Sequence, residues 1–260
     1  MAASGPGAAE HPLSFGPLWR RTTLVLGRHR ELLWPLAAAM FFLPQLLFAM
    51  VEPDRTSGLD LDFLASLPVV TVLVAGLLVT VTGQVAVAYV AVHDGTNGLT
   101  LGQVIVRAAT MVGPAFAMLL LQGLATVAGI LLLIVPGLLL FARLAVALPL
   151  LATGPRDPLL ALRTSWRLTD GFTVRILVSL VTLLAGIFLF YAGVLSLGIL
   201  LSSPEALTAS FGRWSIGRWV LELLSAGAVA AIGLVSVAFY SSLLVAIRAL
   251  RTARQSVGQP

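Results

Sequence analysis

Hydrophobic residues in this chain fall into six long apolar stretches separated by short polar ones. About 20 consecutive apolar residues are enough for a helix to cross the hydrocarbon core of a bilayer. The pattern therefore predicts an all-α integral membrane protein with six transmembrane helices. Their expected ranges are 31–51, 67–92, 114–135, 137–152, 172–200 and 216–247.

Three shorter segments have a different pattern. In each, apolar residues recur at the spacing of a single helix face, and arginines lie on the neighbouring positions. Such segments typically lie in the membrane interface, with the arginines directed at lipid phosphates. We therefore expect three amphipathic surface helices, at 14–30, 101–108 and 157–170, whose arginines include Arg21, Arg107, Arg163 and Arg167.

Composition supports the membrane assignment and excludes several kinds of chemical site. Only 10% of the residues are charged, against roughly a quarter in a soluble domain. The absence of cysteine excludes disulfides, thiolate metal sites and cysteine nucleophiles. All basic residues are arginine, which with the abundant alanine, leucine and glycine suggests a GC-rich bacterial gene. The pI of about 10.9 reflects arginines flanking the spans, so we expect anionic lipids as partners and no nucleic acid.

The distribution of arginines predicts the orientation. With six spans and both termini cytoplasmic, 12 arginines lie inside, and 3 lie outside: Arg55, Arg213 and Arg218. If Pro136-Gly137 only kinked one long span, the split would fall to 7 inside and 8 outside. Because cytoplasmic loops are enriched in basic residues, the first topology is strongly favoured. Pro136 and Gly137 are therefore predicted to form the outer turn of a hairpin, in a multi-pass protein of the bacterial cytoplasmic membrane.

The same segments suggest an internal repeat. Aligning Gly27, Gly113 and Gly171 superimposes the apolar positions of the three surface helices. Each copy would then be a surface helix followed by a helical hairpin, giving three hairpins of one orientation. The predicted domain organisation is a disordered tail at 1–13, one membrane domain at 14–250 and a basic cytoplasmic tail at 251–260.

Arg143 is the most distinctive single residue. Counted from a helix start at Gly137, it lies near mid-membrane, where a charge must face the interior of the bundle or a cavity. One interpretation pairs it with Glu222, the one carboxylate within a predicted span that could reach it. The alternative is an anion or lipid-phosphate site, with polar companions at Gln84, Gln122 or Tyr240. The ion pair would have a structural role, whereas the anion or lipid-phosphate site would have a functional one.

The segment around Trp166 combines an interface tryptophan with two arginines, Arg163 and Arg167. A tryptophan ring suits the interface, because its body is apolar and its N–H requires a partner. We interpret the segment as a membrane anchor, with a lipid-headgroup site as the alternative. Ser165 has no histidine near it in sequence, and one ordered histidine does not make a metal site. We therefore expect no enzyme activity, no metal and no cofactor.

Residues 134–175 carry a linear pattern that resembles a known family. The pattern consists of Ile134-Val135-Pro136-Gly137, Arg143-Leu144, Pro149, Ala161-Leu162, Ser165-Trp166, Leu168-Thr169, Gly171 and Arg175. It is similar to the bacterial glycerophosphoryl diester phosphodiesterase membrane-domain family, also called YciC-like. The resemblance implies an all-helical membrane module, which in some relatives is fused to a soluble phosphodiesterase domain. We expect no such domain here, so the resemblance does not lead us to expect phosphodiesterase activity.

These observations favour a non-enzymatic membrane module that binds lipid or acts as a scaffold, for itself or for other envelope proteins. The alternative is a transporter of a small solute or lipid, with an anion-binding cavity around Arg143. The short fourth span and the repeat are the features that point to transport.

Overall fold

The computed structural model describes residues 11–51, 67–93, 100–154, 156–201 and 216–257. Within these ranges the chain is all helical, as the sequence predicts. The elements are α1 (Phe15–Arg28), α2 (Arg30–Ala37), the π-helix η1 (Ala38–Phe42), α3 (Leu43–Val51), α5 (Leu67–Val92), α6 (Leu101–Ala109), α7 (Val112–Leu132), α8 (Ile134–Leu144), α9 (Ala147–Thr153), α10 (Pro158–Thr169), α11 (Thr173–Leu201) and α13 (Ile216–Val257).

Six segments of the described chain are long and apolar enough to cross a membrane, which confirms the number of spans predicted from the sequence. They are Arg30–Met50, Leu67–Val92, Val112–Leu132, Val135–Thr153, Thr173–Gly198 and Trp219–Ser256. Many of their large apolar side chains point outward, Phe188 and Leu131 among them. Such exposure is expected where the surrounding solvent is lipid, because apolar side chains then gain nothing from burial in protein.

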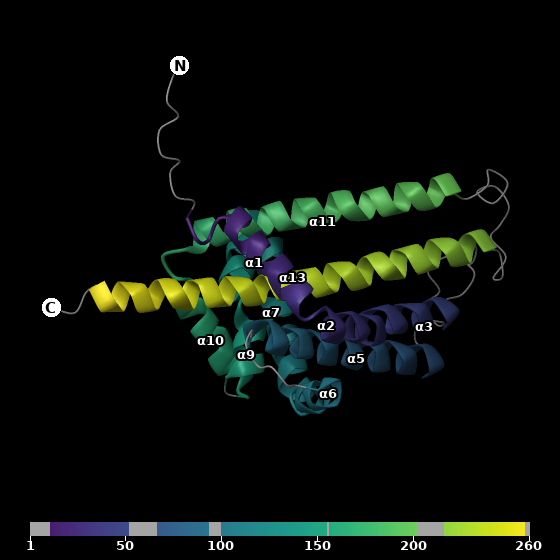
Figure 1. Cartoon of the computed structure of the whole chain (residues 1–260), viewed down its shortest axis with the longest axis horizontal. Helices are drawn as coiled ribbons and strands as arrows, with labels where there is room; N and C mark the ends of the chain where they lie inside the picture. Colours follow the sequence, from purple (N-terminus) through teal and green to yellow (C-terminus); the bar gives the residue numbers. More distant parts are fainter. Residues whose placement is uncertain (1–10, 52–66, 94–99, 155, 202–215, 258–260) are drawn as a thin grey trace, which may run out of the picture.

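Helices α3, α5, α11 and α13 run along the long axis of the molecule (Figure 1). Helix α10 lies at one end of this axis, beside the start of α11 and the C-terminal part of α13; we call this the α10 end. The end of α11 and the start of α13 lie at the opposite end. Helix α3 packs against α5, α7 against α8, and α11 against α13, while α1 crosses the surface of α13.

Among the described residues, the interior consists of two apolar clusters. One joins α2, η1, α5, α7 and α9, and includes Phe41, Val85, Met118 and Leu151. The other joins α1, α8, α11 and α13, and includes Leu18, Ile176, Phe239 and Leu243. Small residues bring helices close: an added Cβ at Gly83 would lie 3.3 Å from Met40 Cγ, and one at Gly233 would lie 3.2 Å from Phe41 Cδ1.

The two prolines of the first span, Pro35 and Pro44, flank the π-helix η1. The sequence predicts a bend here, because proline has no N–H to donate within a helix. In the structure the Leu43 N–H bonds to the Ala38 carbonyl, five residues back, which is the π-helical pattern. The wider π-helical turn accommodates the bend just before Pro44.

The chain reverses between α7 and α8 at Leu133, whose φ of −165° and ψ of 139° are extended. Pro136 and Gly137, predicted as the turn itself, instead lie in the first turn of α8, where a missing N–H costs no helical bond. Gly137 packs closely against α7: an added Cβ would lie 2.6 Å from the backbone nitrogen of Ile130. The glycine therefore permits close helix packing and does not make the reversal.

The fourth span is broken, which the sequence does not predict. Helix α8 ends at Leu144, a turn occupies Ala145 and Val146, and α9 follows. Every residue of α9 from Ala147 to Ala152 is buried. Arg143 therefore lies in the last turn of a short helix and not in the middle of a continuous one.

Both predicted tails need correction where the structure describes them. Residues 1–10 of the predicted disordered tail lie outside the described ranges, but Leu13 is fully buried, and the Ser179 hydroxyl donates to its carbonyl at 2.8 Å. At the other terminus, α13 continues without interruption to Val257. Arg251 and Arg254 are therefore part of a helix and not of a separate tail.

Candidate functional site

Helix α10 has sequence-encoded limits at both ends. At its start, the Asp157 carboxylate accepts hydrogen bonds from the Leu159 and Leu160 N–H groups at 2.9 and 3.4 Å, and Pro158 occupies the first helical position. At its end, Asp170 is extended and Gly171 has a φ of +80°, a conformation that glycine adopts without strain. The chain then turns directly into α11.

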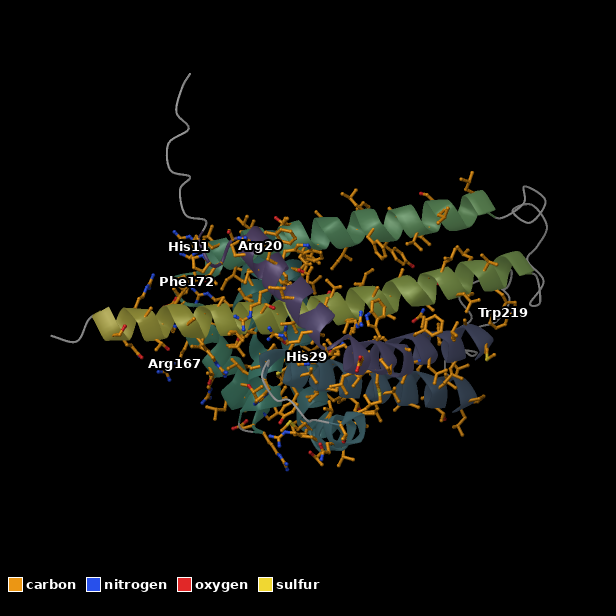
Figure 2. The ribbon with its side chains drawn as sticks, viewed as in Figure 1. His11, Arg20, His29, Arg167, Phe172 and Trp219 are labelled. Carbon is orange, nitrogen blue, oxygen red and sulfur yellow. The ribbon has the colours of Figure 1, made fainter. Side chains whose placement is uncertain are left out.

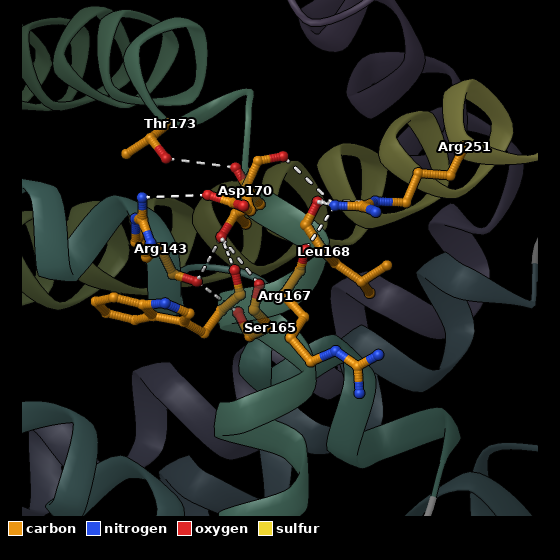
Figure 3. Close-up of polar contacts among 9 residues, drawn as sticks. Arg143, Ser165, Arg167, Leu168, Asp170, Thr173 and Arg251 are labelled. Atoms are coloured by element: carbon orange, nitrogen blue, oxygen red, sulfur yellow. Dashed lines mark hydrogen bonds and ion pairs between the residues drawn. The ribbon is translucent and has the colours of Figure 1, made fainter. Parts of the chain in front are cut away.

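The end of α10 contacts Arg143 (Figure 3). The Arg143 Nη2 lies 3.3 Å from Asp170 Oδ1, and its guanidinium lies over the Trp166 ring, 4.4 Å from the centroid. The Arg143 side chain is 27% exposed and that of Asp170 is 68% exposed. The charge is therefore balanced by a carboxylate and an aromatic face at the surface of the helix bundle.

The backbone of Arg143 is bound from the same helix. Its carbonyl accepts a hydrogen bond from the Ser165 hydroxyl at 2.7 Å, and the Thr169 hydroxyl lies 3.2 Å away. The last carbonyls of a helix have no intrahelical partner, and the break after Leu144 leaves the Arg143 carbonyl in this position. Ser165 and Thr169, one turn apart on α10, supply the missing donors. Ser165 is thus placed as a structural hydroxyl.

A second arginine holds the end of α10 from another helix. Arg251 of α13 donates through Nη2 to the carbonyls of Arg167 at 2.5 Å and Leu168 at 3.1 Å, and through Nε to Leu168 at 3.2 Å. These are the carbonyls that a helix C-terminus leaves unpaired, and its dipole favours a cation there. We call Arg143, Ser165, Thr169, Asp170 and Arg251 the α10 junction.

Sequence reasoning does not find Arg251, because its contacts join residues more than 80 positions apart. The only available signal is general: an unpaired helix end requires donors, and arginines are abundant near the C-terminus.

The predicted pairing of Arg143 with Glu222 is not what the structure shows. The ion pair of Arg143 is with Asp170. Glu222 lies one turn after Trp219, at the opposite end of the molecule from Arg167 (Figure 2). Its side chain is 8% exposed. The polar groups proposed as companions in an anion cavity, Gln84, Gln122 and Tyr240, are not among the contacts of Arg143 either.

The remaining predicted residues lie on separate helices. The side chains of Arg163 and Arg167 are exposed on α10. The guanidinium of Arg107, on α6, lies 4.7 Å from the centroid of the Tyr89 ring. Arg21, on α1, faces a groove against α13. The structure brings Arg143 to Trp166 but does not gather the other arginines into one cluster with them.

In the described part of the chain, no three histidine, aspartate or glutamate side chains lie close enough to hold a metal ion. The α10 junction offers ion pairing and carbonyl capping between three helices. These are interactions that fix helix positions. No protein-family model, curated protein or solved structure matches the chain.

Proposed function

We propose that this chain is a non-enzymatic module of the bacterial cytoplasmic membrane that binds anionic phospholipid headgroups at its α10 end. The observation that carries the proposal is the position of the arginines. Arg20 and Arg167, on helices far apart in the sequence, both lie toward the α10 end, opposite Trp219 (Figure 2). Arg175 lies in the first turn of α11 and Arg254 in the last turn of α13, at the same end.

The physical basis is electrostatic attraction to a charged leaflet. Each arginine near an anionic membrane surface contributes about 1 kcal/mol of attraction. Trp19 and Trp166 are both partly exposed near these arginines, at 38% and 41%. An indole ring beside arginines matches the boundary between headgroups and acyl chains. Together they support a membrane-facing basic surface.

The contacts of Arg143 favour its structural interpretation. A transport function needs the guanidinium to face a cavity that a solute can enter, whereas here it is engaged by Asp170 and Trp166. The break between α8 and α9 is filled, because α9 is buried along its length. We therefore propose no transport function.

The resemblance to the YciC-like membrane domains fits this proposal but stays a prediction. So do the three-hairpin arrangement and the interfacial position of α1, α6 and α10. The hairpin arrangement is supported by three pairs of neighbouring helices: α3 with α5, α7 with α8, and α11 with α13. Each of the three short helices directly precedes a span-length helical segment, which supports the repeat.

Lipid binding can be tested on protein purified from membranes of mixed composition. Mass spectrometry of the co-purified lipid should show enrichment of phosphatidylglycerol or cardiolipin over zwitterionic lipids. A variant with Arg163→Gln and Arg167→Gln should lower the enrichment, because it removes two exposed charges from α10. Co-purified lipid that merely matches the bulk membrane would overturn the proposal.

The orientation can be tested by cysteine accessibility, since the chain has no cysteine of its own. Gly137 is unsuitable for labelling because any side chain there meets Ile130. Leu133, 68% exposed at the reversal, is the better position. Leu133→Cys should react with an impermeant reagent from outside the cell and Arg163→Cys should not. The opposite labelling pattern would show that the orientation in the membrane is the reverse of the predicted one.

A further inference from the structure

A groove of about 700 Å³ lies between α1 and the C-terminal part of α13. Figure 1 shows α1 crossing α13 here, so the groove is formed by two helices that meet at an angle. Its lining includes Arg20, Arg21, Leu24, Arg28, Ala249 and Leu250. Three arginines and no acidic residue are found among the described residues that line it.

Packing on the adjoining face of α1 holds these arginines in place. Thr22 and Val25 are fully buried, and the Thr22 hydroxyl lies 3.3 Å from the Ser242 hydroxyl of α13. Positions 21, 24 and 28 follow the i, i+3, i+7 spacing of another face of the same helix. Arg21, Leu24 and Arg28 are therefore presented along the groove by a helix that is itself fixed.

Arg21 has a buried hydrogen-bond donor that lacks an acceptor in the part of the chain that the structure describes. Its Nε atom is buried and has no hydrogen-bond partner among the described residues. A buried donor on a charged group is costly when unpaired, because it has lost its water and gained no acceptor. An anion in the groove would supply that acceptor, and phosphate oxygens match the geometry of a guanidinium.

The surroundings favour a lipid phosphate over a soluble one. Leu24, beside the arginines, is 71% exposed. A second hollow of about 480 Å³ is lined by Phe15 and Trp19 of the same helix, together with apolar residues of α11 and α13. Helix α1 thus borders a basic groove and an apolar one. This combination fits a ligand that has both a phosphate and acyl chains.

We propose that the groove between α1 and α13 is a saturable site for one anionic phospholipid, whose phosphate is bound by Arg21 with Arg20 and Arg28. The acyl chains lie against Leu24. This inference rests on the proposed function and adds a specific site to it. A diffuse basic surface would instead lose affinity by similar amounts whichever arginine was replaced.

Native mass spectrometry of the full chain in detergent, titrated with phosphatidylglycerol, tests the site. We expect one lipid to bind with saturation and in preference to phosphatidylcholine. Arg21→Gln should weaken this binding about tenfold, the effect of losing one charge-assisted hydrogen bond. Arg156→Gln, which removes an exposed charge just before α10 and outside the groove, is the matched control and should change the affinity less than twofold.

Ala249→Trp tests the same groove without any change of charge. Ala249 is exposed, so the ring can fill the groove without disturbing the core, and binding should fall as in Arg21→Gln. Unchanged thermal unfolding of both variants would show that folding is intact. If one of the two variants fails to fold, lipid binding by the other variant still tests the site.

The possible failures are distinguishable. Equal loss in Arg21→Gln and Arg156→Gln, with the preference for phosphatidylglycerol retained, would overturn the site but leave the proposed function standing. Binding of phosphatidylglycerol and phosphatidylcholine alike by the unmodified chain would overturn both. Displacement of the lipid by an equal concentration of glycerol 3-phosphate would show that the groove takes a soluble phosphate, which also overturns the lipid site.

Discussion

Arg143 and Asp170 form an ion pair with 3.3 Å between Nη2 and Oδ1, and this pair joins the end of α8 to the residue that follows α10. Asp170 lies three positions before the start of α11. Arg143 is therefore level with the beginning of α11, although it lies midway along the fourth span-length segment, Val135–Thr153. A carboxylate that is largely exposed also neutralises it without the desolvation cost of a buried pair.

A double-mutant cycle on Arg143 should identify its partner. Combining Arg143→Met with Asp170→Asn should give a coupling free energy below about 1 kcal/mol, as for other exposed ion pairs. Combining Arg143→Met with Glu222→Gln should give no coupling, since Glu222 lies at the far end of the molecule. Equilibrium unfolding in mixed detergent micelles measures both. Coupling to Glu222 larger than that to Asp170 would contradict the structure.

Arg251 should contribute more to stability than the Arg143 pair does. Its guanidinium donates to two carbonyls at the end of α10. Hydrogen bonds to charged groups contribute about 1.5–3 kcal/mol, so Arg251→Met should lower the free energy of unfolding by roughly that amount. Arg251→Lys should recover only part of it, because an ammonium cannot reproduce the fork of donors.

Arg167→Met is the control, since that side chain is exposed and only its carbonyl is used. Its unfolding free energy should stay close to that of the unmodified chain. Hydrogen exchange should also quicken in α10 for Arg251→Met and not for Arg167→Met. Equal destabilisation by the two variants would contradict a specific role for Arg251.

The spans could be predicted from sequence, whereas the α10 junction could not. A span depends on local properties, length and hydropathy, which the sequence displays directly. The partner of Arg143 depends instead on where α8 ends. It ends before Ala145-Val146, a pair that contains neither proline nor glycine and gives no local signal of a break. The placement of Glu222 as the partner followed from assuming one continuous helix there.

Gly137 illustrates a partial success. The Pro-Gly pair marked the right region, and the arginine count required the chain to reverse near it. The reversal itself occurs at Leu133, since proline is compatible with the first turn of a helix. What sequence could not specify is the contact with Ile130, which depends on how closely α7 and α8 approach.

Acidification should release the N-terminal segment through His11. The His11 Nε2 lies 2.9 Å from Arg175 Nη1, and the Leu13 N–H donates to its Nδ1 at 3.2 Å. Partial desolvation, together with the positive charges of Arg175 and Arg254, lowers the pKa of His11. The neutral ring is favoured in the folded state, so its contribution to stability is full above the unfolded pKa of about 6.5 and falls as the pH decreases below it.

Hydrogen exchange of the peptide that contains Leu13 should therefore lose protection as the pH falls below about 6.5, after correction for intrinsic rates. His11→Gln should remove this dependence, because glutamine does not titrate. A dependence that persists in His11→Gln would assign the effect to another group.

The close packing of α7 and α8 gives the sharpest test of the fold. Gly137→Ala would place a Cβ 2.6 Å from the Ile130 nitrogen, a backbone atom that cannot move aside without shifting the helix. Overpacking of this kind costs about 1–3 kcal/mol, so the variant should unfold more easily in mixed micelles.

Gly123→Ala in the same hairpin is the matched control, since an added Cβ there meets nothing within 4 Å. It should be neutral or slightly stabilising, because alanine forms helix better than glycine. Similar losses in the two variants would mean that helix propensity or lipid contact, and not the approach of α7 to α8, determines the outcome.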